Sequence, residues 1–213
     1  MRKILNILCV VFIVSYIFIP MKVGARSLDN QEMISIEEYT EIVTKECERV
    51  GISIQVISDK KMVPVESLIG AFNAIDAVAN SQVTSEYNSL EIREPVDGVR
   101  GITGMPVDRV GYQSFTVTNL LGWAKIAVDV YVTIDAQNNH IISINNVSTY
   151  VHSGQNVSGW NCTGIGQSMN NPSDGYVTLN VNGIASFSYT DPVFGITNVL
   201  TTNVSQNVAV DCR

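Results

Sequence analysis

Ionisable side chains are scarce in this sequence of 213 residues. Asp, Glu, Lys and Arg together make up 15% of it, and there are 2 histidines, His140 and His152. Histidine is the usual acid or base near neutral pH and the commonest metal ligand, so the scope for acid–base catalysis or a histidine-rich metal centre is small. Positions twelve apart in one strand share a face but are too distant to bind one metal ion. We therefore expect no catalytic residue, no metal and no cofactor.

Basic side chains are the rarer of the two signs. The sequence has 13 Lys and Arg against 20 Asp and Glu, a formal net charge of −7. A nucleic-acid-binding protein presents a basic face, so this balance excludes that class. The 15 glycines and 6 prolines exclude a collagen-like chain, and a hydrophobic content of 46% excludes a disordered one. The length is enough for one domain, or a small pair, with a real core.

Long apolar runs are absent after residue 25, so no later stretch is predicted to span a membrane. At the start, Arg2 and Lys3 precede an apolar run over 4–19, and Val23-Gly24-Ala25 has the small residues that signal peptidase recognises. This pattern predicts a cleaved signal peptide over 1–25 and a protein that is secreted or held at the extracellular surface. An uncleaved N-terminal anchor is the alternative, because the run is long for a signal.

Cleavage would leave 10 basic residues against 20 acidic ones, a net charge of −10, and would remove Cys9. Three cysteines would remain. In an oxidising compartment Cys162 and Cys212, both in the C-terminal part, are the natural disulfide pair. We interpret Cys47 as a free thiol buried on a helix, with a reactive or intermolecular thiol as the alternative.

The N-terminal part has helical periodicity. After a linker over 26–34, apolar residues recur at helical spacing over 35–50, with a capping box at Ser35 and Glu38 and a C-terminal Gly51. A short alternating strand follows from Ile52, and a second helical pattern begins after Pro64. The helical part with its connecting segment spans 35–109, where a further strand is expected around 90–92.

The C-terminal part, 110–213, has the patterns of antiparallel strands. Residues 123–135 alternate strictly, and the turn Gln137-Asn138-Asn139 leads into a partner strand over 141–151. The dipeptide Asn182-Gly183 predicts a hairpin turn between two further strands. The predicted fold class is therefore α+β: two N-terminal amphipathic helices packed on or beside a C-terminal antiparallel β-sandwich or barrel-like sheet. Residues 35–213 could equally form one continuous domain.

Candidate binding residues are few. Trp160 and Tyr150 are candidate ligand contacts for a sugar ring or a peptide, and the Asn- and Gly-rich surroundings of Trp160 suggest an exposed loop. Asp174 lies in an Asn-, Pro- and Gly-containing run, 170–175, whose oxygens could bind Ca²⁺. That run lacks the spacing of a calcium loop and is more typical of a turn. The alternative for the aromatic residues is a place in the core.

Sequons for N-glycosylation begin at Asn146, Asn156, Asn161 and Asn203. The sequence does not decide whether they are glycosylated.

These features favour a secreted, non-catalytic β-rich module that binds an extracellular ligand, a carbohydrate or a protein. One alternative is an extracellular hydrolase that uses carboxylates such as Asp129 or Asp174. A further alternative is a secreted toxin or antimicrobial protein, against which the acidic start of the first helix argues.

Overall fold

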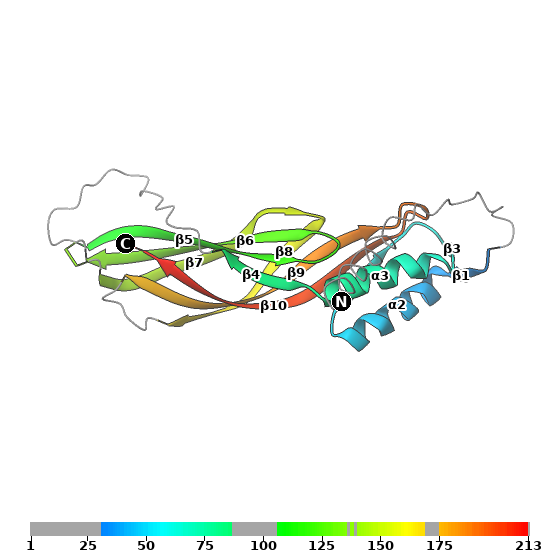
Figure 1. Cartoon of the computed structure of the whole chain (residues 1–213), viewed down its shortest axis with the longest axis horizontal. Helices are drawn as coiled ribbons and strands as arrows, with labels where there is room; N and C mark the ends of the chain where they lie inside the picture. The colour runs from blue at the N-terminus through cyan, green and yellow to red at the C-terminus, as the bar shows by residue number, and fades with distance from the viewer. Residues whose placement is uncertain (1–30, 87–105, 136, 139, 169–174, 213) are drawn as a thin grey trace, which may run out of the picture. The chain divides into compact units, whose positions relative to one another are not determined.

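The computed structural model describes residues 31–86, 106–135, 137–138, 140–168 and 175–212, and the part of the chain from residue 33 onward forms one unit. The predicted signal peptide, most of the linker over 26–34 and the strand expected around 90–92 lie outside the described residues. Within the described residues, two helices accompany antiparallel strands that make up most of the structure (Figure 1). No described helix has both the length and the apolar character required to cross a membrane.

Helix α2 (Ile36–Val50) forms where the sequence predicts it. The Ser35 Oγ atom accepts a hydrogen bond from the backbone N–H of Glu38 at 3.1 Å, which caps the first turn. Gly51 ends the helix with a φ of 76°, a left-handed conformation that favours glycine. Tyr39, Val43 and Cys47 are the buried stripe.

Helix α3 (Ser67–Ala79) packs beside α2, and a small two-stranded sheet of β1 (Met33–Ser35) and β3 (Met62–Pro64) lies next to them. α3 also packs on strands of one of the two large sheets, and its buried residues include Ala71, Ala74 and Val78.

The first large sheet has the strand order β4-β5-β6-β7 and is antiparallel throughout. The predicted strand over 123–135 is confirmed in full as β6, and the predicted partner over 141–151 is confirmed as part of a longer β7. The bounds are β4 (Gln82–Glu86), β5 (Pro106–Thr118), β6 (Trp123–Asp135) and β7 (His140–Gln155).

The second large sheet has the strand order β2-β10-β9-β8 and is also antiparallel. It takes its edge strand β2 from the segment between the two helices, where the sequence predicts a short strand. The bounds are β2 (Ser53–Ile57), β8 (Val157–Ser168), β9 (Tyr176–Thr190) and β10 (Thr197–Asp211).

The hairpin predicted at Asn182-Gly183 is wrong. Both residues lie within β9, which pairs with β10 without interruption over its whole length. The turn lies instead between β9 and β10, where Asp191 Oδ1 accepts hydrogen bonds from the backbone N–H groups of Val193 and Phe194 at 2.8 and 2.9 Å. Gly195 completes this turn with a φ of 68°.

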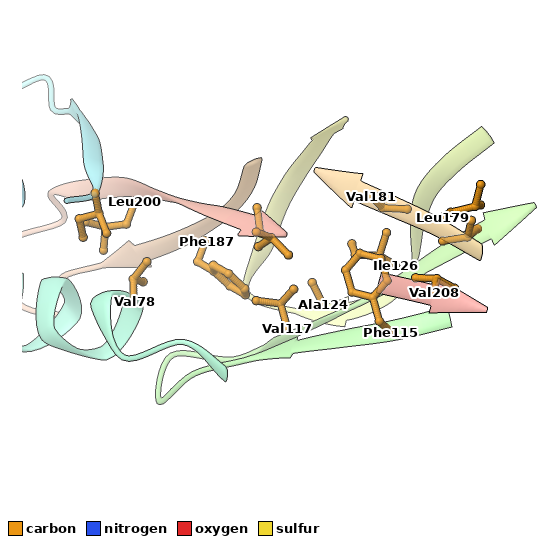
Figure 2. Packing of buried hydrophobic residues seen from close by; sticks show 14 of the residues in the cluster. Val78, Phe115, Val117, Ala124, Ile126, Leu179, Val181, Phe187, Leu200 and Val208 are labelled. Carbon is orange, nitrogen blue, oxygen red and sulfur yellow. The ribbon is translucent and has the colours of Figure 1, made fainter. Parts of the chain in front are cut away.

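One hydrophobic core joins the inner faces of the two sheets and the helices. Figure 2 shows Phe115, Val117, Ala124 and Ile126 of the first sheet among side chains of the second, with Val78 of α3 near Leu200 of β10. The second-sheet side chains labelled in that view are Leu179, Val181, Phe187, Leu200 and Val208. The chain is therefore mainly an antiparallel β structure with two short helices, and its sheets curl toward a half-barrel.

The two parts expected from the sequence, 35–109 and 110–213, share both sheets. β2 and β4 come from the first part and pair with β10 and β5 of the second. At the position of Gly111 in β5, an added Cβ would lie 2.8 Å from Cys212 Sγ and 2.6 Å from a methyl of Val210, so β5 also passes close to the end of β10.

Candidate functional site

The predicted disulfide between Cys162 and Cys212 does not form. Both residues are free thiols, as is Cys47. The strand register explains why: Cys162 is opposite Gly183, and Gly183 is opposite Val204, eight residues before Cys212. Eight residues of strand span roughly 26 Å, whereas a disulfide requires Cα atoms within about 7 Å. The predicted pairing of Cys162 with Cys212 is therefore wrong.

The cysteines differ in their surroundings. Cys47 and Cys212 are buried, and Cys162 is half-buried on the edge strand β8. Burial raises the pKa of the Cys47 thiol to about 11 and that of Cys212 to about 12. Both therefore remain protonated at neutral pH, and neither has the lowered pKa of a catalytic cysteine.

Trp160 lies in β8, not on an exposed loop as expected. Its indole N–H donates a hydrogen bond to Thr149 Oγ1 of β7 at 3.0 Å, and its ring meets Phe115 edge to face with centroids 5.8 Å apart. A Cβ added at Gly183 would lie 2.4 Å from two atoms of the indole ring. Trp160 thus contacts strands of both sheets, and its ring packs against the core.

Tyr150 is placed differently from Trp160. It lies on β7 directly opposite Ala127 of β6 and keeps 37% of its surface exposed. The third candidate, Asp174, lies outside the described residues. Of the two predicted ligand contacts that the structure describes, Tyr150 is therefore the more exposed.

The outer face of β5, β6 and β7, the face turned away from the core, carries a polar and aromatic cluster. Alternation along β6 puts Ile126, Val128 and Val130 in the core and Ala127 and Asp129 on the opposite face.

Two adjacent rows of opposed residues cross this face. One row is Tyr112–Asp129–Ser148, and the next is Ser114–Ala127–Tyr150. We use the term outer-face site for Tyr112, Ser114, Asp129, Tyr150 and His152, which surround Ala127.

Two oxygen atoms in the outer-face site are buried and unsatisfied. Asp129 is 8% exposed and Ser114 is 0% exposed. Among the residues that the structure describes, neither Asp129 Oδ1 nor Ser114 Oγ has a hydrogen-bond partner. Buried polar groups in proteins are nearly always paired, so an orphaned carboxylate oxygen and an orphaned hydroxyl on adjacent rows make this face the candidate site.

Aromatic rings surround these two oxygens. The rings of Tyr112 on β5 and His152 on β7 meet edge to face, with centroids 6.4 Å apart. Because β6 lies between β5 and β7, this contact passes over the outer face of β6, above the row that holds Ala127. Tyr131, two residues after Asp129, adds a further ring that is 38% exposed. This face therefore combines aromatic rings with the two oxygen atoms of Asp129 and Ser114.

The outer-face site has the composition of a binding site. Flat aromatic rings pack against the apolar faces of sugars or side chains, and the carboxylate and hydroxyl oxygens accept hydrogen bonds from a ligand. No group of three or more His, Cys, Asp or Glu side chains within the described ranges could hold a metal ion.

The sequence indicated Asp129 and Tyr150 as candidate residues. It did not predict that they share a face with Tyr112 and Ser114. Strict alternation over 123–135 was a signal for Asp129, since it sets that residue opposite the apolar side chains. Tyr112 and Ser114 join the site through the register of β5 with β6, and His152 joins it through a bulge between β6 and β7. No local sequence pattern specifies either alignment.

Comparison with known proteins adds no relative to this description. No protein-family model, no curated protein and no solved structure matches the chain.

Proposed function

We propose that this protein is a secreted, non-catalytic module that binds a carbohydrate through the outer face of β5, β6 and β7. The observation that carries the proposal is the outer-face site. In it the exposed ring of Tyr150 and the half-buried ring of Tyr112 share a face with a buried carboxylate oxygen and a buried hydroxyl that have no partner among the described residues. Sugar-binding surfaces combine aromatic packing with acceptors for sugar hydroxyl groups, and this face offers both.

The alternative of a carboxylate-dependent hydrolase has weaker support. Such enzymes use two carboxyl groups about 5–9.5 Å apart. On this face Asp108 of β5 is opposite Thr133, four residues along β6 from Asp129, a separation of about 13 Å along the strand. Asp108 also accepts a hydrogen bond from Thr133 at 2.6 Å. Asp129 therefore serves better as a ligand contact than as half of a catalytic pair.

Export is part of the proposal and has its own test. We expect the mature protein to begin at Arg26, after cleavage at Ala25, because the basic, apolar and small-residue regions follow each other in the order of a secretory signal. N-terminal sequencing of the exported protein checks this. A product that retains Met1 and sediments with membranes would support the anchor instead.

The binding proposal is tested on arrays of glycans and surface proteins with the mature protein. Tyr150→Ala should weaken the strongest signal at least about ten-fold, the usual cost of losing an aromatic contact at the centre of an interface. The matched control is Tyr176→Ala, which removes a ring of similar exposure, 41% against 37%, from the second sheet.

Equal effects of the two substitutions, or the absence of binding to every glycan, would contradict the proposal. If the protein bound only surface proteins on the arrays, its function would be protein recognition instead of carbohydrate binding. Trp160→Ala is unsuitable as a probe, because the indole packs between the sheets and its loss would disturb the fold.

A further inference from the structure

We infer that the outer-face site binds a primary ammonium group, held by Asp129 and Ser114 beside the ring of Tyr112. This inference rests on the proposed function and adds to it the chemical class of the ligand: an amine, such as a free amino sugar, instead of a neutral sugar.

The spacing of the two orphaned oxygens suits one small donor. Ser114 is opposite Ala127, and Asp129 is two residues farther along β6. Ser114 and Asp129 are therefore diagonal neighbours on one face. Diagonal neighbours in antiparallel strands have Cβ atoms about 7 Å apart or closer. Both oxygens are buried, so an ammonium nitrogen can lie about 2.9 Å from each of them only where the side chains that cover them move aside.

Charge favours an ammonium over a hydroxyl in this place. Asp129 is mostly removed from water, and its Oδ1 atom has no partner among the described residues. The ion pairs found among the described residues do not involve Asp129. A buried carboxylate that lacks a counter-charge is costly, and a hydroxyl ligand would supply none. An ammonium supplies both the missing charge and up to three N–H donors, and such charge-assisted hydrogen bonds are the strong ones.

The aromatic side chains favour the same ligand. Tyr112 is directly opposite Asp129, so its ring is an immediate neighbour of the carboxylate. A cation near the face of a tyrosine ring gains a cation–π interaction that is stronger where water is excluded. The excess of acidic residues in the chain, 20 against 13 basic, also attracts a cationic ligand over a distance.

Lys125 does not remove the need for a ligand cation. It lies on the same face of β6, but four residues before Asp129, about 13 Å along the strand. Asp129 Oδ1 remains without a hydrogen-bond partner in the described structure despite this lysine.

The test compares two pairs of probes that differ by one acetyl group. Short oligomers of glucosamine are titrated against the same oligomers of N-acetylglucosamine, and a lysine peptide against its acetyl-lysine form, with the mature protein followed by calorimetry. We expect a free amine to bind at least about ten-fold more tightly than its acetylated partner. The sugar and peptide pairs show which source of the ammonium is preferred.

Two matched variants assign the effect. Asp129→Asn keeps the shape of the side chain but removes its charge, and should lower the affinity for the amine probe at least about ten-fold. Asp108→Asn makes the same change on the same face, four residues along from Asp129, and should change binding less than two-fold. As a measurement that needs no variant, added salt should weaken the amine probe and leave the acetylated probe unchanged.

Equal affinity for amine and acetylated probes, or full binding by Asp129→Asn, would overturn the inference. If neutral glycans bind and Tyr150→Ala still weakens them, the proposed function stands and the ammonium assignment fails. If no probe or glycan binds in a way that Tyr150→Ala reduces, the proposed function fails as well.

Discussion

Single atoms determine the character of the outer-face site. Asp129 and Ser114 lie in the middle of a sheet, yet each keeps a buried oxygen without a partner. Because both oxygens are buried, this arrangement lowers the stability of the free protein. A ligand that supplied the missing partner to either oxygen would remove this cost.

The stability cost predicts the effect of removing the hydroxyl. Ser114→Ala deletes an oxygen that is buried and unpaired, so the free energy of unfolding should rise by about 0.5–1 kcal/mol. Ser148→Ala, on the same face opposite Asp129 but only half-buried, should change it by less than that. Urea unfolding of the two variants measures the difference, and a loss of stability in Ser114→Ala would show that the hydroxyl is paired.

Thiol labelling checks the placement of the cysteines. With iodoacetamide at pH 8, Cys162 should react fastest, because it is half-buried on an edge strand. Cys47 and Cys212 should react slowly, because burial hinders access and raises the pKa of the two thiols to about 11 and 12. Mass spectrometry of the labelled peptides gives the order. Resistance of Cys162 together with Cys212, relieved only by a reductant, would restore the disulfide.

At the residue scale, the sequence predicted which side chains are buried better than it predicted which residues contact each other. Helical spacing was enough to place Cys47 in the core. The sequence could not show which residues lie opposite Cys162, because position along the chain does not determine how two long strands are aligned. Trp160 was misplaced for a related reason: Asn and Gly around it are typical of loops, but here they belong to a strand that packs closely on its neighbour.

The strands of this protein are the elements that resist prediction from local signals. β9 continues through Asn182-Gly183, although this dipeptide is a strong turn signal. The glycine is required there by contact, since the ring of Trp160 occupies the space of a Cβ at Gly183. By contrast, β6 was predicted to the residue, because its alternation is strict and it lies at the centre of a sheet.

This account predicts opposite outcomes at two glycines. Gly183→Ala should destabilise the protein by about 1–3 kcal/mol, because the new methyl group overlaps the Trp160 ring. Gly166→Ala on β8 should cost little, since its methyl would meet Asn180 at an ordinary 3.6 Å. Thermal unfolding of both variants makes the comparison. Equal stabilities would contradict the close contact between Gly183 and the Trp160 ring.

On the scale of the whole molecule, the helices and both sheets share one core. A buried polar contact joins them: the Tyr39 hydroxyl of α2 lies 3.4 Å from Asn198 Oδ1 of β10 and 3.2 Å from Asn198 Nδ2. Burial raises the pKa of Tyr39, so its hydroxyl stays protonated over the physiological range. The sequence predicted both helices, but not which strands they would contact, because those contacts join residues 159 positions apart.

Breaking this contact should loosen the helices. Tyr39→Phe leaves the fully buried amide of Asn198 without its partner and should cost about 1–2 kcal/mol in the free energy of unfolding. The double variant Tyr39→Phe with Asn198→Val removes both polar groups and should recover most of that loss. Chemical denaturation monitored by helical circular dichroism measures both, and an unchanged single variant would mean that the contact contributes nothing.

The central claim is that the outer face of β5, β6 and β7 is where this protein binds its ligand. NMR mapping of backbone amide shifts tests it most directly, with a glucosamine oligomer titrated into the mature protein. The account predicts that the largest shifts fall on Tyr112, Ser114, Asp129 and Tyr150. Shifts confined to the opposite sheet, around Asn180 and Asn207, would place binding elsewhere and contradict it.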